Sequence, residues 1–226
     1  IGGFLISITD TSLIFFICGT GFFCMMAVLL TLEVRQDNNT KDTPWYEFKE
    51  GVKFVLHHRL FLTLILLSWI SMFFGTSYVQ IMPLFADMLQ SGERGFGLLI
   101  SATGIGSIIG NLFISHYQES RKLGIMMLSS AAIAPFCLIG FSLVAWIFAG
   151  KAGVFWMACC FVILASALSS VFLVSSMTVL QVKVPDDFRG RVMGIHSITF
   201  SMISLGGLVA GVIAAKLSAP VAVVIG

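Results

Sequence analysis

Long apolar stretches alternate with short charged segments along this chain. Six stretches of 22 to 31 residues contain no Asp, Glu, Lys or Arg: Thr11–Leu32, Leu60–Ala86, Gly95–Gln118, Leu123–Gly150, Ala152–Val182 and Val192–Ala215. A helix needs about 20 apolar residues to cross the roughly 30 Å hydrocarbon core of a bilayer. The stretches lack the alternating polarity of membrane β-strands, and helices satisfy their own backbone in lipid. We therefore predict six whole membrane-spanning helices.

The two ends of the chain are apolar as well. Residues 1–9 precede Asp10 without a charge, and residues 217–226 follow Lys216 in the same way. We interpret each end as part of a further span. The chain would then be a fragment that holds six whole and two partial membrane helices.

Composition agrees with lipid as the solvent of this chain. Hydrophobic residues make up 58% and charged residues 11%, whereas soluble domains contain about 25% charged residues. This excludes a water-soluble globular domain and a disordered chain. A net charge of +2 gives no indication of a nucleic-acid partner. The five cysteines lie in apolar stretches without a CxxC pair, so we expect neither a metal site nor a cofactor.

The distribution of Lys and Arg predicts the orientation in the membrane. The connections on one side carry ten of them: Arg35, Lys41, Lys49, Lys53, Arg59, Arg121, Lys122, Lys183, Arg189 and Arg191. The connections on the other side carry Arg94, Lys151 and Lys216. By the positive-inside rule the first side is cytoplasmic, and we expect a multi-pass protein of a bacterial inner membrane.

Residues 33–59 form the one long polar connection. Thr43 is a suitable N-cap and Pro44 suits the first position of a helix. Apolar residues then recur at helical spacing from Trp45 to Val55, which predicts an amphipathic helix at the cytoplasmic interface. Both a lipid-facing spacer and a helix that binds a partner fit this pattern.

Polar side chains without charge mark several of the predicted spans. They can bond to neighbouring helices or line a wet cavity, and both interpretations remain open for each residue. The candidates for a substrate cavity are Tyr78, Gln80, Asn111, Ser169, Ser176 and Ser201. Glycine pairs at a spacing of four predict close helix packing at Gly106 and Gly110 and at Gly207 and Gly211. Pro83 and Pro135 are candidate kinks.

The segment Val184–Gly194, VPDDFRGRVMG, is the most specific motif in the chain. It resembles the signature before the eleventh helix of the major facilitator superfamily, in particular its enterobactin-exporter and macrolide-efflux branch. Asp186 or Asp187 can cap the following helix, and Arg189 and Arg191 can either pair with another loop as a gate or anchor the helix end. His196 lies one and a half turns further on and is a further gate candidate, for which a structural hydrogen bond is the alternative.

Three more segments support the same resemblance. Tyr78–Phe85 and Gly95–Gly106 look like its seventh and eighth helices, and Glu50–Leu60 resembles the helix between its two halves. The resemblance implies an all-α membrane bundle: residues 1–32 end the N-terminal half, 33–59 form the cytoplasmic linker, and 60–226 form the C-terminal half up to the early twelfth helix. It also implies that the seventh, eighth, tenth and eleventh helices line a central cavity.

These observations predict a secondary-active transporter rather than an enzyme. We expect it to export an amphiphilic small molecule, such as a drug or siderophore, by alternating access with a proton gradient. Its partners would be the lipid bilayer, the substrate and an N-terminal half of the same chain. The alternatives are lysophospholipid flipping, nutrient uptake, or a membrane anchor for a fused enzyme.

Overall fold

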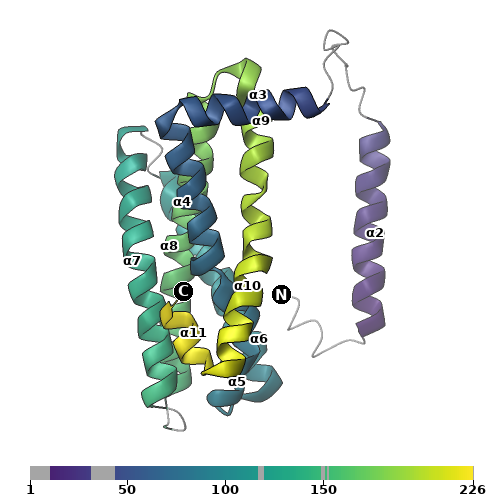
Figure 1. Ribbon diagram of the computed structural model, residues 1–226. Helices are drawn as coiled ribbons and strands as arrows, with labels where there is room; N and C mark the ends of the chain where they lie inside the picture. Colours follow the sequence, from purple (N-terminus) through teal and green to yellow (C-terminus); the bar gives the residue numbers. More distant parts are fainter. Residues whose placement is uncertain (1–10, 32–43, 117–119, 149–150, 152, 226) are drawn as a thin grey trace. The chain divides into compact units, whose positions relative to one another are not determined.

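The computed structural model describes residues 11–31, 44–116, 120–148, 151 and 153–225 (Figure 1). The described residues are almost entirely helical and contain no β-strand, which confirms the predicted all-α class. By internal contacts the chain divides into two units, Ile1–Pro44 and Trp45–Gly226. The described part of the first unit is one apolar helix, α2 (Thr11–Leu30), which coincides with the first predicted span.

The second unit is a bundle of helices connected by short turns. Its elements are α3 (Pro44–His57), α4 (Arg59–Gly75), the 3₁₀ helix η1 (Ser77–Ile81), α5 (Met82–Met88), α6 (Gly92–His116), α7 (Ser120–Ile147), α8 (Val154–Lys183), α9 (Asp186–Ser197), α10 (Thr199–Lys216) and α11 (Ala219–Ile225). Among the described residues, five segments of this bundle are long and apolar enough to cross a membrane. They coincide with the other five predicted spans.

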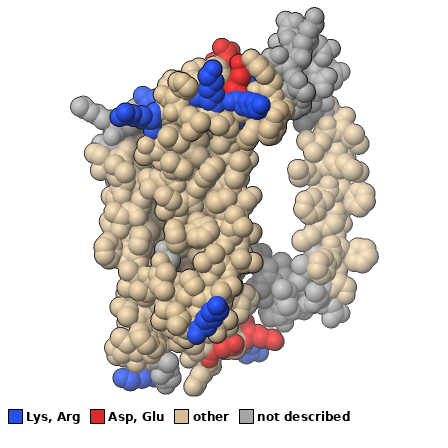
Figure 2. Space-filling model, viewed as in Figure 1, with Lys and Arg blue, Asp and Glu red and all other residues tan. Residues whose placement is uncertain are grey.

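Charged side chains gather at the two ends of the bundle and leave an uncharged belt between them (Figure 2). The belt exposes many large apolar side chains, including Phe136, which is 72% exposed, and Leu208, which is 69% exposed. Water-soluble proteins rarely leave such large continuous apolar surfaces uncovered. The belt therefore has the surface of a protein that is surrounded by lipid.

The second predicted span is interrupted near its middle. Helix α4 ends at Gly75, and the hydroxyls of Thr76 and Ser77 donate to the carbonyls of Met72 and Phe74 at 2.8 and 3.0 Å. These side chains satisfy backbone acceptors where the α-helical ladder stops. The chain continues as η1 and then α5, in which Pro83 is the second residue, where its missing N–H costs little.

Helix α8 lies at the centre of the bundle, and both α6 and α7 pack along it. Helix α10 packs on α4 and η1, and α11 packs on α7 and α10. Helix α7 continues through Pro135 as one helix. The long apolar segment after Pro185 is divided at Ile198 into α9 and α10, because Ile198 and Ser201 make turn-type backbone bonds to residues three earlier.

Helix α3 runs across one end of the bundle, in a different direction from α4 (Figure 1). The chain turns at His58, which has extended backbone angles of φ −110° and ψ 99°. Helix α3 begins at Pro44, which confirms the predicted first position; the predicted cap Thr43 lies outside the described residues. Val55 is buried and Trp45 is exposed, so the later turns of α3 are packed more deeply than its first turn.

Candidate functional site

Two glycines bring α6 directly onto the backbone of α8. A Cβ atom at Gly106 would clash with the carbonyl oxygen of Ile163, and one at Gly110 would clash with the carbonyl of Ala167. On α10 the close approach lies at Gly206, against the carbonyl of Phe73. Small residues allow such contacts, in which backbones meet without intervening side chains.

The remaining predicted packing glycines, both on α10, lie in different surroundings. Gly207 touches the side chain of Gln80, whereas Gly211 has no described atom within 4 Å of the place of a Cβ. The tight part of the α10 contact is therefore at Gly206 and Gly207, with Gly211 outside it.

Asn111 forms a polar pair on the surface between α6 and α8. The hydroxyl of Ser170 donates to Asn111 Oδ1 at 2.7 Å, and Asn111 is exposed. Ser169 is half-buried beside it in sequence. Ser170 is not among the cavity candidates of the sequence analysis, because its place opposite Asn111 depends on the α6–α8 contact at Gly110.

Gln80 and Ser201 lie on the η1 and α10 side of the bundle. Both side chains are exposed, and the Gln80 chain rests on Gly207. Ser201 precedes Gly207 by six residues, or about 9 Å along a helix. An exposed amide on the apolar surface of a membrane bundle needs a polar neighbour, since an unpaired polar group in hydrocarbon is costly.

Tyr78 and Ser176 lie inside the bundle, away from this surface. Tyr78 Oη is 3.0 Å from Ser166 Oγ, and Ser176 Oγ is 2.9 Å from Ser68 Oγ. Both pairs are buried, and they connect η1 and α4 to α8. Neither residue contributes to an exposed wall in this conformation.

At the α3 end of the bundle, Arg191 of α9 binds two carboxylates of α3. Its Nη1 is 2.5 Å from Glu50 Oε2, and its Nη2 is 3.9 Å from Glu47 Oε1. The helices cross at Gly51, where a Cβ would lie 2.9 Å from Arg191 Cβ. Because Gly51 has no side chain, α3 comes close enough for both glutamates to reach the guanidinium.

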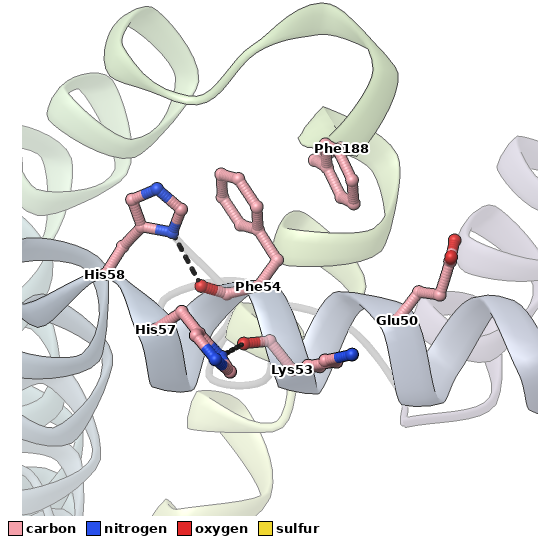
Figure 3. Close-up of a pocket in the computed structure, with 6 residues that line it drawn as sticks. All are labelled: Glu50, Lys53, Phe54, His57, His58 and Phe188. Atoms are coloured by element: carbon pink, nitrogen blue, oxygen red, sulfur yellow. Dashed lines mark hydrogen bonds between the residues drawn. The ribbon is translucent and has the colours of Figure 1, made fainter.

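Aromatic rings extend this contact between the two helices. Phe54 of α3 stacks on Phe188 of α9 with ring centroids 4.4 Å apart, and the Arg191 guanidinium lies 5.5 Å from the Phe188 ring centroid. A pocket of about 240 Å³ opens beside the stack (Figure 3). Its lining residues are Glu50, Lys53, Phe54, His57, His58 and Phe188.

The other gate candidates make local contacts at the start of α9. Arg189 pairs with Asp186 at 2.6 Å, and its Nε donates to the carbonyl of Gln181 at 3.0 Å. Pro185 occupies the N-cap, so Asp186 and Asp187 are the first two helical residues and neither caps the helix with its side chain. Their carboxylates still lie at the positive end of the helix dipole.

His196 is buried, with 2% of its surface exposed, near the break between α9 and α10. Its Nδ1 lies 3.4 Å from the hydroxyl of Thr199, which is also buried. The described residues contain no group of three His, Cys, Asp or Glu side chains that could hold a metal ion.

Comparison with known proteins identifies the family. The profile of the Major Facilitator Superfamily matches residues 1–210, which is most of the chain. Neither the curated proteins nor the solved structures give a significant match. The matched residues include α2 to α9 and most of α10. The chain therefore belongs to the Major Facilitator Superfamily of membrane transporters.

Proposed function

We propose that this chain exports an amphiphilic small molecule, of the drug or siderophore class, across a bacterial inner membrane by proton-coupled alternating access. The polar sector of α6 is the observation that carries the proposal. At 100° per residue, Leu99, Ala102, Gly106 and Gly110 form the buried sector of α6. Leu98, Ile105, Ile109 and Leu112 form an exposed apolar sector. Gly97, Gly104, Ser107 and Asn111, with Ile100 among them, form a third sector beside the buried one, on the side away from the exposed apolar sector.

Lipid alone does not account for this third sector. A helix between bundle and lipid needs only a buried and an apolar sector, whereas this one adds an amide paired with Ser170. A wall of a wet cavity has such a mixture of small and hydrogen-bonding residues. We assign Asn111, Ser169, Ser170, Gln80 and Ser201 to that wall.

Tyr78 and Ser176 have a different role in this proposal. Their buried pairs with Ser166 and Ser68 hold η1 and α4 on α8. They brace the helices that carry the wall, and substrate does not reach them in this conformation.

The wall offers few polar groups to a substrate. We therefore expect the transporter to accept bulky apolar substrates with weak specificity.

The contact between α3 and α9 serves as the cytoplasmic gate. Arg191 is held by carboxylates of the linker helix α3. A movement of either half of the transporter against the other would therefore stretch or break the ion pairs between Arg191 and these glutamates. The predicted spans of this chain hold no charged residue, and we place the proton-coupling carboxylate in the N-terminal half of the transporter.

Two variants of the full-length transporter test the wall. Asn111→Leu and Gln80→Leu should each lower export about three- to tenfold, the loss of one hydrogen bond to substrate or cavity water. Ser129→Leu, at an exposed position of α7, is the matched control and should export normally. Efflux and uptake are measured in parallel in cells that lack other pumps, at equal protein levels.

The proposal has two separate ways to fail. Normal efflux in both variants would remove Asn111 and Gln80 from the wall. Net uptake of the substrates in the wild type would leave the wall intact but reverse the direction of transport.

A further inference from the structure

Helix α3 presents three sectors around its axis. Gly51 and Val55 are buried in the bundle. Glu47, Glu50 and Phe54 form the second sector and meet α9. The third sector is exposed and consists of Trp45, Lys49, Lys53 and Leu56, which fall within about 80° of one another at 100° per residue. We call this third sector the outer sector of α3.

The outer sector is cationic and apolar at once. Both carboxylates of α3 lie at Arg191, on another sector, so the outer sector carries Lys49 and Lys53 without an acidic residue of its own. Lys49 Nζ lies 5.8 Å from the ring centroid of Trp45. Trp45 is 65% exposed and Leu56 is 59% exposed, which is unusual for side chains of this size on a helix that packs against a protein.

The position of α3 relates this sector to the bilayer. The helix crosses the end of the bundle at the level where charged residues begin (Figures 1 and 2). Leu60, the second residue of α4 after the turn at His58, is also exposed and begins the apolar surface of α4. The outer sector therefore lies at the level where the charged end of the bundle meets the apolar surface that faces lipid.

From these observations we propose that the outer sector of α3 binds anionic phospholipid headgroups. Lys49 and Lys53 contact the lipid phosphates, while Trp45 and Leu56 enter the boundary between headgroups and acyl chains. Helices with cations beside Trp and Leu bind membranes in this way, and each lysine near an anionic surface adds to the affinity. The lipid would hold α3 in the plane in which Glu47 and Glu50 reach Arg191.

Fluorescence of Trp45 in the full-length transporter tests the proposal. All other tryptophans are replaced by Phe, including Trp69, Trp146 and Trp156; the indole nitrogen of Trp69 has no partner among the described residues, so this replacement removes no hydrogen bond there. The protein is placed in nanodiscs of phosphatidylcholine that contain brominated phosphatidylglycerol or, at the same fraction, brominated phosphatidylcholine. Bromine quenches a nearby indole.

We expect brominated phosphatidylglycerol to quench Trp45 more strongly than brominated phosphatidylcholine. The lipid preference should fall about fivefold for each lysine that is replaced in Lys49→Gln and Lys53→Gln. Lys151→Gln with Lys216→Gln removes two charges outside α3 and should keep the preference.

Three results would overturn the proposal. Equal quenching by both lipids would show contact without selection of anionic headgroups. A preference that survives both lysine replacements would place the selection elsewhere. Weak quenching by either lipid would mean that protein covers the outer sector.

Discussion

The contacts of α6 with α8 and of α3 with α9 differ in what holds them together. At Gly106 and Gly110 two backbones touch inside an apolar bundle, and no side chain can adjust. Between α3 and α9 the contact consists of an ion pair and a ring stack that are partly open to solvent. The first contact opens only with loss of packing, whereas a partly exposed ion pair costs about 1 kcal/mol or less to break. We infer that the bundle moves as a rigid body while the α3 contact opens and closes.

The largest effect should come from adding one carbon to the rigid contact. Gly110→Ala places a Cβ against the carbonyl of Ala167, and we expect a loss of about 1–3 kcal/mol of stability, the usual cost of overpacking. Gly104→Ala, on the same helix with open space at the Cβ, is the control. Thermal unfolding in detergent measures both, and equal melting of the two variants would contradict the assignment of Gly110 to a tight contact.

The gate should respond in rate rather than in stability. Replacing Arg189 and Arg191 together by Gln removes the pairs with Asp186, Glu47 and Glu50, and we expect turnover to slow several-fold with normal insertion into the membrane. Transport rate at equal protein level measures the effect. In a second variant, Glu50→Arg with Arg191→Glu, the ion pair is re-formed with its charges exchanged. We expect this variant to transport faster than the variant in which both arginines are replaced by Gln. Normal turnover in the double variant would reduce both arginines to membrane anchors.

A smaller effect is expected from the ring stack. Phe54→Leu and Phe188→Leu each lose the stacked geometry, which is worth about 0.5–1.5 kcal/mol beyond buried area. A double-mutant cycle on stability isolates the coupling between the two rings. If the stability losses of Phe54→Leu and Phe188→Leu are additive, the stacked geometry contributes nothing beyond the apolar area that the two rings bury.

The smallest effect should come from the buried serine pair. Ser176→Ala removes one partner of Ser68, but the Ser68 hydroxyl still donates to the carbonyl of Leu64 at 2.9 Å. We expect a loss of less than about 1 kcal/mol, the typical net value of a hydrogen bond. Thermal unfolding again measures it, and a loss as large as that of Gly110→Ala would show that Ser176 holds α4 on α8 more firmly than its hydrogen bonds indicate.

The elements that depend on the local pattern of residues could be predicted from the sequence. Charge-free length predicted the five segments that are long and apolar enough to cross a membrane among the described residues, and Pro44 marked the start of α3. Pro83 was predicted as a kink of the second span, but the interruption begins earlier, at Gly75, where the hydroxyls of Thr76 and Ser77 bond to backbone carbonyls.

The side-chain pairs between distant segments of the chain could not be predicted from the sequence pattern. Glu50 and Arg191 are 141 residues apart, and their contact depends on how α3 crosses α9. Gly51 in the middle of an amphipathic helix was the available signal, since a glycine there costs helix stability and indicates a close approach. The exposed pairing of Asn111 with Ser170 likewise depends on the depth to which Gly110 lets α6 approach α8.

Cross-linking α3 to α9 tests most directly whether this contact opens during transport. Phe54→Cys and Phe188→Cys are introduced into a full-length transporter whose native cysteines are replaced, and a short bifunctional thiol reagent with a reducible spacer joins them. We expect transport to stop in the cross-linked protein and to return when the spacer is reduced. Full transport with α3 and α9 joined would contradict it.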